Sequence, residues 1–192
     1  YGSYKNNQFT SSEVTLGGIY IVRDPRNLVS SLMHHFSLNK EETLNMLFDE
    51  NCEVKSSDGN FSTYTFLSSW SNHFNSWNSI KSFKTLIIKY EDLKDNSEKV
   101  FENLIKFINV LLKNNKDIDF LKMGNAIKST QFNTLREKEQ KEGFVEAVPL
   151  QNKKKRFFNL GFKNDWRENM DKSTILKIEK KFSKEMKYLG YI

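Results

Sequence analysis

The sequence predicts an α/β protein in which helices cover a parallel sheet. Two short apolar runs, residues 18–22 and 85–89, are rich in β-branched side chains and indicate strands buried on both faces, as is typical of parallel sheets. Helix signals follow each run, as expected for strands that alternate with helices. With 192 residues, 38% of them hydrophobic, the chain is long enough for one substantial core, so we expect a single domain over residues 1–192.

Residues 17–36 form the most informative stretch. Arg23 stands at the carboxyl end of the first strand, Asp24 suits the N-cap of a following helix, and Pro25 suits its first position. Ligands of open α/β sheets bind beyond the carboxyl ends of the strands, where a helix N-terminus also favours anions. Arg23 can bind a phosphate there, and Ser31 on the helix can be a second donor. The alternative is a structural ion pair between Arg23 and Asp24, with Ser31 a tolerated small residue.

The region between the two strands is predicted to be mainly helical. Residues 39–49 form a short amphipathic helix, and residues 51–60 a polar loop. Aromatic residues recur at helical spacing over residues 63–78, which predicts one long core helix. His73 lies among tryptophans of this helix, where a hydrogen-bonded structural histidine is the expectation and a catalytic role the alternative.

More helices are expected after the second strand. Ser97 suits the N-cap of a helix whose apolar stripe runs to Leu111, and residues 118–127 are helical. The charged side chains of residues 128–142 are expected to form a solvated face. Phe132 fits either core packing or stacking on a base. Residues 171–186 form a final amphipathic helix, capped by Asp171 or Ser173.

The composition limits the classes of binding partner but does not identify one. The net charge of +6 suits an anionic ligand, a nucleic acid or a membrane surface alike. The basic run 153–156 alone indicates a solvated patch more readily than a nucleic-acid site. The single cysteine, Cys52, excludes an internal disulfide and indicates a reducing compartment. Since no apolar run approaches the ~20 residues of a membrane span and no signal peptide is apparent, we expect a cytoplasmic protein without a membrane partner.

Several segments, in the right order, resemble the cytosolic-type sulfotransferases, and most closely a bacterial branch of them. These enzymes use 3′-phosphoadenosine 5′-phosphosulfate (PAPS), which becomes 3′-phosphoadenosine 5′-phosphate (PAP). The matching segments are R-D-P-R-N with a Ser eight residues after the first Arg, W-x-x-H-x-x-x-W from Trp70, Y-E-D-L from Tyr90, T-x-F from Thr130, and F-F-x-x-G before Asp165-Trp166. The resemblance implies a three-layer α/β/α fold like that of P-loop nucleoside-triphosphate hydrolases.

The resemblance also implies roles for individual residues. Arg23 and Ser31 would hold the 3′-phosphate of the cofactor, and Gly161 would close over it. Adenine would be framed by Tyr90, Thr130 and Phe132, although a strand-end tyrosine that anchors the sheet is an equal reading of Tyr90. No metal is implied, and the acceptor would be a hydroxyl or amine of a small molecule or carbohydrate. A homodimer stays open.

The chain departs from the family pattern at the basic segment. When Asp165-Trp166 is aligned with the family, the expected Arg and Lys fall on Asn159 and Leu160, and the second Gly falls on Asn164. Arg156 and Lys163 are the neighbouring charges that could compensate for the missing ones.

The family's P-loop segment and its catalytic histidine have no counterpart in these residues. We expect them, and further strands, to lie outside this sequence, so the catalytic residue is unknown. Two other interpretations stay open: a relative that binds the 3′-phosphonucleotide without catalysis, and a basic module that binds single-stranded nucleic acid with steep salt dependence. A P-loop kinase of small molecules would need Mg²⁺ ligands that the sequence does not reveal.

Overall fold

The computed structural model describes residues 3–4, 7–8, 11, 13–58, 61–144, 149–150, 153–154 and 156–192. Its longer strands are β3 (Gly17–Val22), β4 (Glu53–Asp58), β5 (Phe61–Phe66) and β6 (Lys84–Lys89). The shorter strands are β1 (Ser3–Tyr4), β2 (Asn7–Gln8), β7 (Pro149–Leu150) and β8 (Lys153–Lys154). The helices are α1 (Pro25–Phe36), α2 (Lys40–Phe48), α3 (Trp70–Asn78), α4 (Tyr90–Asp95), α5 (Ser97–Leu111), α6 (Phe120–Ser129), α7 (Phe132–Glu142), the 3₁₀ helix η1 (Gly161–Lys163), α8 (Trp166–Asn169), α9 (Lys172–Lys181) and α10 (Ser183–Leu189).

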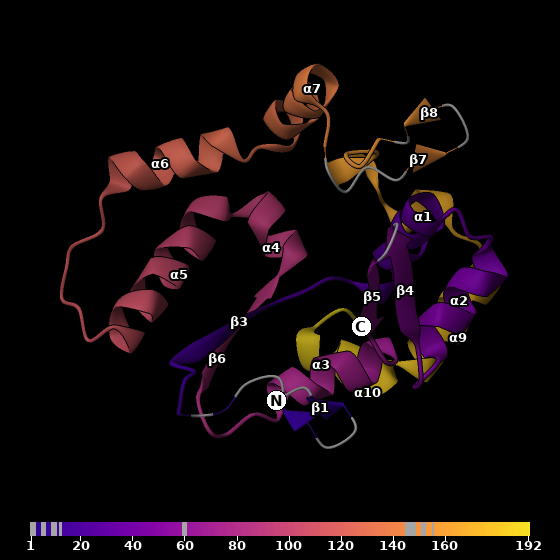
Figure 1. Cartoon of the computed structure of the whole chain (residues 1–192), viewed down its shortest axis with the longest axis horizontal. Helices are drawn as coiled ribbons and strands as arrows, with labels where there is room; N and C mark the ends of the chain where they lie inside the picture. The colour runs from indigo at the N-terminus through magenta and orange to yellow at the C-terminus, as the bar shows by residue number, and fades with distance from the viewer. Residues whose placement is uncertain are drawn as a thin grey trace.

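The two predicted strands pair with each other. β3 and β6 lie side by side and run parallel, as Figure 1 shows. Gly17 lies opposite Lys84 and Val22 opposite Lys89. Each strand begins one residue before the predicted range. Because parallel strands end at the same edge, the residues that follow β3 and β6 emerge side by side. The segment after Val22 and the start of α4 therefore meet at one edge of the sheet.

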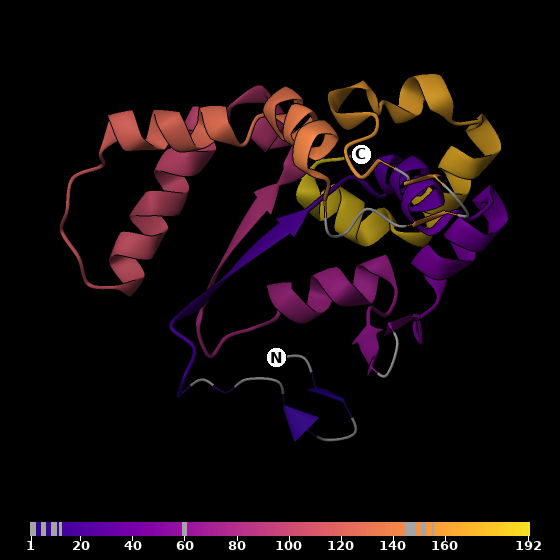
Figure 2. The same cartoon turned by 45° about the horizontal axis from the view of Figure 1, so that its top comes forward.

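Helices lie on both sides of this strand pair. A Cβ on Gly17 would lie 2.5 Å from Leu111 of α5, whereas a Cβ on Gly18 would lie 3.1 Å from Trp77 of α3. Neighbouring residues of a strand face opposite sides of the sheet, so α5 and α3 cover opposite faces. Figures 1 and 2 show the same arrangement of helix, sheet and helix. This is the predicted three-layer order.

The expectation that the first strand is buried on both faces is wrong for the described residues. Tyr20 and Val22 are buried, but Ile19 is 45% exposed and Ile21 is 55% exposed. The physical reason is that α5 contacts the Gly17 end of this face and leaves the rest of it open. β3 therefore alternates as a half-covered strand does.

The main core lies on the other face of β3. Side chains of α1, α2, α3, α9 and α10 meet there, and Phe74, Phe182, Ile178 and Met186 are at most 1% exposed. These helices gather around one end of the strands in Figure 2, while α5 and α6 lie away from them. Since buried apolar area stabilises by roughly 25 cal/mol per Å², this packing is what holds the ends of β3 and α1 in place.

Two predictions for the region between the strands are wrong. The expected polar loop 51–60 contains β4, which pairs antiparallel with β5. The expected long helix 63–78 begins only at Trp70, because residues 63–66 belong to β5. Thr, Tyr and Phe fit a pleated strand well, and Ser68, with a φ of 59°, separates strand from helix. Ser69 then caps α3 by accepting the Asn72 N–H at 3.3 Å.

Three helix boundaries differ from the predictions. Asn96, not Ser97, is the N-cap of α5, and the stripe of this helix is half-buried rather than buried. The helix predicted over residues 118–127 is α6, which Asp119 caps by accepting the Lys122 N–H at 2.9 Å. The predicted final helix is two helices, α9 and α10, that meet at buried Phe182, and Asp171 caps the first as expected.

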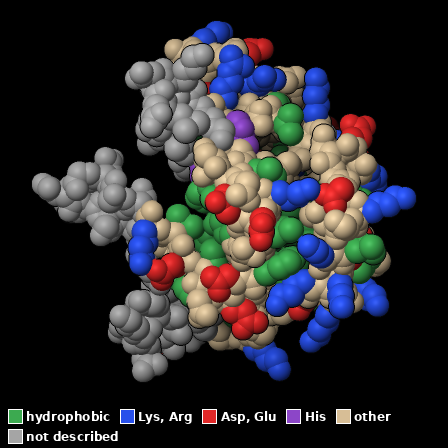
Figure 3. All heavy atoms as spheres, turned by 90° about the vertical axis from the view of Figure 1, so that its right-hand side faces the viewer, with side chains coloured by type: hydrophobic (Ala, Val, Ile, Leu, Met, Phe, Trp, Pro, Cys, Tyr) green, Lys and Arg blue, Asp and Glu red, His purple; other side chains and the backbone are tan. Residues whose placement is uncertain are grey.

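On the face shown in Figure 3, Lys and Arg side chains are interspersed with Asp and Glu side chains. Of the basic run 153–156, Lys155 lies outside the described residues. Within the described ranges, no helix combines the length and the apolar character that crossing a membrane requires.

Candidate functional site

The start of α1 is built as the sequence predicts. Asp24 accepts the Arg26 N–H at 2.9 Å, and Pro25 occupies the first turn. The Asp24 carboxylate also forms a buried ion pair with the Arg26 guanidinium, at 2.6 Å. Among the ion pairs of the described residues, Asp24 is therefore partnered by Arg26 and not by Arg23. The alternative prediction, a structural ion pair between Arg23 and Asp24, is therefore wrong.

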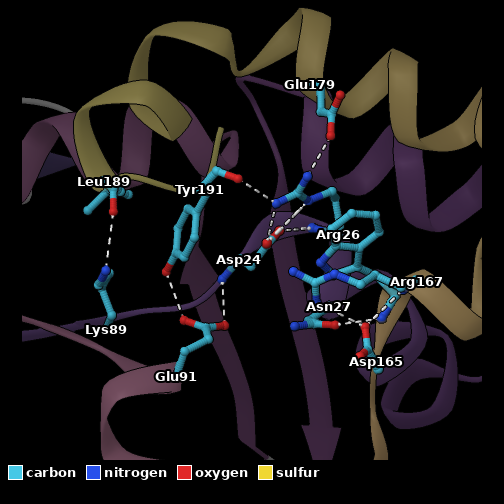
Figure 4. A network of polar contacts seen from close by, with 11 residues as sticks. Asp24, Arg26, Asn27, Lys89, Glu91, Asp165, Arg167, Glu179, Leu189 and Tyr191 are labelled. Atoms are coloured by element: carbon cyan, nitrogen blue, oxygen red, sulfur yellow. Dashed lines mark hydrogen bonds and ion pairs between the residues drawn. The ribbon is translucent and has the colours of Figure 1, made fainter. Parts of the chain in front are cut away.

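Arg26 connects this corner to the end of the chain, as Figure 4 shows. Its guanidinium pairs with Glu179 at 2.5 Å, donates to the Tyr191 carbonyl at 2.9 Å and lies 3.9 Å from the centroid of the Trp166 ring. The pKa of Arg26 is raised: burial lowers it, but the hydrogen bonds and charges of Asp24 and Glu179 outweigh that effect. Arg26 is therefore a structural anchor of the corner.

Glu91 ties the ends of the two strands together. One carboxylate oxygen accepts the Asp24 N–H at 3.1 Å, and the other accepts the Tyr191 hydroxyl at 2.9 Å (Figure 4). Burial, and then the negative charge of Glu91, raise the pKa of Tyr191 well above its usual value, so the hydroxyl stays a donor. The edge at which β3 and β6 end is thus held rigidly from the C-terminal side.

Arg23 and Ser31 meet at this edge. The Nη1 of Arg23 donates to Ser31 Oγ at 3.1 Å, and the guanidinium lies 4.4 Å from the centroid of the Tyr90 ring. The Nε of Arg23 is buried and has no hydrogen-bond partner among the described residues. A buried donor without a partner costs roughly 1–3 kcal/mol. The Arg23 Nε–H is therefore a donor that no group of the described residues satisfies.

Asn164 completes this arrangement, although sequence reasoning did not select it. Its side-chain Nδ2 donates to the Asn27 carbonyl at 2.9 Å and to Ser31 Oγ at 3.0 Å. Its Oδ1 accepts the Ser30 hydroxyl at 2.5 Å. Asn27 in turn accepts the Trp166 N–H through Oδ1 at 3.0 Å. The segment after η1 is thereby fastened to the first turns of α1.

A cavity of about 280 Å³ opens at the edge where these groups meet. Its walls come from the end of β3, the start of α1, α4 and the segment around η1: Arg23, Asn27, Tyr90, Glu91, Lys94, Asp95, Gly161, Asn164, Asp165 and Arg167. Ser31 is half-buried next to this wall and is hydrogen-bonded to two of its residues, Arg23 and Asn164. Asp165 is partnered by Arg167 at 3.3 Å, and the backbone N–H and side chain of Arg167 lower its pKa. The cavity wall therefore carries the Arg23 guanidinium, which follows β3, beside the Tyr90 ring, together with further basic side chains and the carboxylates of Glu91, Asp95 and Asp165.

Gly161 and Phe132 are in direct contact. Gly161 has a φ of 54°, and a Cβ at this position would lie 2.5 Å from the Phe132 ring. The ring also packs edge-on against Phe158, with centroids 6.0 Å apart. Thr130 lies apart from the cavity wall, since it is exposed and its hydroxyl donates to the Ala126 carbonyl at 2.9 Å. Gly161 thus reaches the cavity, Phe132 packs behind it, and Thr130 caps the end of α6.

The two charges expected to compensate lie outside the cavity wall. Arg156 is exposed. When the oxygen and nitrogen of the Gln140 amide are interchanged, its oxygen accepts two N–H groups of the Arg156 guanidinium, at 3.0 and 3.2 Å. The Arg156 carbonyl is 2.7 Å from His34 Nε2. Lys163, at the end of η1, is exposed. The phosphate-binding roles of Arg156 and Lys163 stay predictions. Asn159 and Leu160, which replace the basic residues of the family pattern, are uncharged and do not line the cavity.

His73 has the structural role that was expected. Its Nδ1 shares a hydrogen bond of 2.8 Å with the Tyr20 hydroxyl, and the Tyr20 and Trp77 rings stack with centroids 5.7 Å apart. Burial lowers the pKa of His73, which favours the neutral ring. It lies on α3, away from the residues that line the cavity.

Glu139 departs from the expected solvated face of residues 128–142. It is 8% exposed, and its carboxylate accepts the Phe157 N–H at 2.5 Å and the Phe158 N–H at 3.1 Å. These bonds hold the segment before η1 against α7. No local sequence signal distinguishes Glu139 from its charged neighbours, since its partners lie 18 and 19 residues away.

Comparisons with known proteins find one matching family model and similar solved structures. A family model described as a sulfotransferase domain matches residues 12–190. Among solved structures, the chain is similar to the crystal structure of mouse sulfotransferase SULT7A1 complexed with PAP, with 21% identity and a TM-score of 0.58. The match covers 88% of this chain and 57% of that one, so the chain spans less than two thirds of that structure. A search of curated proteins finds no match. In the part of the chain that the structure describes, no three His, Cys, Asp or Glu side chains gather to hold a metal ion.

Proposed function

The chain belongs to the sulfotransferase domain family, and from this premise we propose that the protein transfers a sulfuryl group from PAPS to a hydroxyl or amine acceptor. The described residues would supply the part of the site that holds the nucleoside end of the cofactor. The observation that carries this proposal is the meeting of Arg23 and Ser31 beside the cavity, with a buried Arg23 N–H left unpaired among the described residues.

The residues at the sheet edge fit a phosphate on a ribose. A guanidinium that offers Nε–H and a terminal N–H can bind two phosphate oxygens in parallel. A hydroxyl or a neutral sugar cannot form this pair of bonds to a charged acceptor. Ser31 holds the other side of the same guanidinium at 3.1 Å, and the Tyr90 ring lies 4.4 Å from it. Arg23 is therefore preorganised, so less side-chain entropy is lost on binding.

The remaining predicted residues have complementary tasks. Tyr90 offers an aromatic ring near the guanidinium. The Phe132 ring fills the space where a side chain of residue 161 would lie, and Gly161 itself lines the cavity. Thr130 follows α6 apart from the cavity wall, and it would contact the base where the nucleotide extends beyond that wall. Arg156 and Lys163 would add longer-range attraction for an anion from exposed positions.

When bound, PAPS supplies the sulfuryl group that is transferred. The described residues bind and orient the nucleotide rather than take part in bond breaking. Arg23 and Ser31 hold the 3′-phosphate, and the wall from Tyr90 to Gly161 limits the access of water to it. No catalytic base is assigned among the described residues.

Isothermal titration of PAP and of 5′-AMP against the protein tests the binding site. Two or more charge-assisted hydrogen bonds to the 3′-phosphate, together roughly 3 kcal/mol, predict that PAP binds about 100-fold more tightly than 5′-AMP. Arg23→Met should remove most of this preference and change 5′-AMP affinity by less than about threefold. Arg136→Met, which removes an exposed arginine of α7, is the matched control for charge. Equal affinity of the wild type for both nucleotides would refute the proposal.

The reaction itself is tested with the full-length protein. Release of PAP from PAPS should depend on an added phenol, amine or carbohydrate acceptor. Tight PAP binding without acceptor-dependent PAP release would instead identify a non-catalytic binding protein and would overturn the transferase assignment.

A further inference from the structure

Asn164 stands where the family pattern has a glycine, and its amide has a fixed orientation. It is 8% exposed and faces the backbone carbonyl of Asn27, which can only accept hydrogen bonds. The amide NH₂ must therefore point toward Asn27, while the amide oxygen faces the Ser30 hydroxyl at 2.5 Å. Turning the amide over would place two oxygens in contact at 2.9 Å. The second N–H of the same NH₂ group consequently points at Ser31 Oγ, 3.0 Å away.

This orientation determines what Ser31 can offer to a ligand. A serine hydroxyl has two acceptor positions and one hydrogen to donate. Asn164 Nδ2 takes one acceptor position at 3.0 Å, and Arg23 Nη1 takes the other at 3.1 Å. Only the hydrogen remains, and its acceptor here, the Asn27 carbonyl, is at the long distance of 3.5 Å. That carbonyl already accepts the shorter bond from Asn164.

We propose that Asn164 is a positioning residue that makes Ser31 an obligate donor, so that the site selects an acceptor-only group, a phosphate dianion, over a hydroxyl. This inference rests on the proposed function. Asn164 itself donates both of its N–H groups to the protein, and it therefore acts on the ligand through Ser31. A glycine at this position would leave one acceptor of Ser31 open, and the hydroxyl could then turn away from the phosphate.

Two variants of Asn164 separate orientation from packing. Asn164→Asp keeps the shape but replaces the NH₂ group with an acceptor, so Ser31 would donate to the new carboxylate and a negative charge would stand beside the phosphate. We expect PAP affinity to fall about 100-fold and 5′-AMP affinity to change less than about threefold. Asn164→Ala removes the amide without adding charge, and should reduce the preference for PAP by about five- to tenfold.

A double-mutant cycle with Ser31→Ala tests whether Asn164 acts through Ser31. In the Ser31→Ala background, Asn164→Ala should change the ratio of PAP to 5′-AMP affinity by less than about twofold, because the hydroxyl it orients is gone. Independent, multiplying effects would overturn the inference, since Asn164 would then contact the ligand by another route. A preference for PAP that survives in Asn164→Asp would overturn it as well.

Thermal unfolding of each variant checks that the fold is intact, and the Ala cycle decides the question if Asn164→Asp does not fold. Different results refute the proposed function and the role of Asn164. A wild-type protein that binds PAP and 5′-AMP equally refutes the proposed function, whereas a wild type that prefers PAP while the Asn164 variants keep the preference refutes only the role of Asn164.

Discussion

The Glu139 carboxylate is the contact whose removal should change the site region most selectively. Its two oxygens accept the backbone N–H groups of Phe157 and Phe158, which begin the segment that leads to Gly161. The aromatic rings of this segment pack against the ring of Phe144, two residues after α7, with centroids 4.8 and 5.3 Å apart. The change Glu139→Ala leaves both backbone groups without their acceptor while the ring contacts remain.

The structure sets the size of the effect. Hydrogen bonds to a charged acceptor contribute about 1.5–3 kcal/mol each when buried. Phe157 is 37% exposed, so water can form part of the hydrogen bonding that is lost. Each bond should therefore contribute about 1 kcal/mol. Glu139→Ala should therefore lower the free energy of opening this segment by about 2 kcal/mol, which is roughly a 30-fold change in the opening equilibrium. Glu139→Gln keeps one acceptor oxygen and should cost about half as much.

Amide hydrogen exchange read by NMR measures this locally. The Phe157 and Phe158 amides should exchange about 30-fold faster in Glu139→Ala and about fivefold faster in Glu139→Gln, while amides of the core helix α9 change little. Glu137→Ala, an exposed neighbour on the same helix, is the matched control and should leave both rates unchanged. Unchanged exchange of the two amides in Glu139→Ala would refute the reasoning.

Three further predictions address stability. Gly161→Ala should cost about 1–3 kcal/mol in urea unfolding and weaken PAP binding, because φ is 54° and the new Cβ meets the Phe132 ring; an unchanged midpoint and affinity would contradict this. His73 has a lowered pKa, so the unfolded chain binds more protons and stability falls as pH drops below about 6.5; His73→Asn should flatten this part of a stability-pH profile, and an equally steep profile would count against it. Tyr191→Phe removes the 2.9 Å bond to Glu91 and should cost about 1 kcal/mol, read from the urea midpoint; no loss would mean that water replaces the bond.

The sequence alone was sufficient to predict the start of α1, where interactions between neighbouring residues determine the structure. The start of α1 depends on Asp24 and Pro25, whose capping and φ preferences act within one turn. The convergence of Arg23 and Ser31 follows from a strand that ends in a helix, since both side chains then belong to the same continuous segment. The parallel pairing of β3 and β6 brought Tyr90 beside them.

Features that depend on distant contacts were not predictable. Strand β5 overlaps a run of aromatic residues whose helical spacing was equally good, and only its pairing with β4 resolves the choice. Glu139 and Asn164 resemble ordinary surface residues in the sequence, but each binds groups that are far away along the chain. The exposed face of β3 has the same cause, since coverage of Ile19 and Ile21 depends on what packs there.

The Arg23 Nε–H group provides the most direct test of the proposed 3′-phosphate site. Its resonance in a ¹⁵N–¹H spectrum can be assigned by its loss in Arg23→Lys, and it can be followed while PAP or 5′-AMP is added. Because this buried N–H has no partner among the described residues, it should shift strongly downfield with PAP and little with 5′-AMP. Binding of PAP that leaves the Arg23 resonance in place, or the same shift with both nucleotides, would contradict the account.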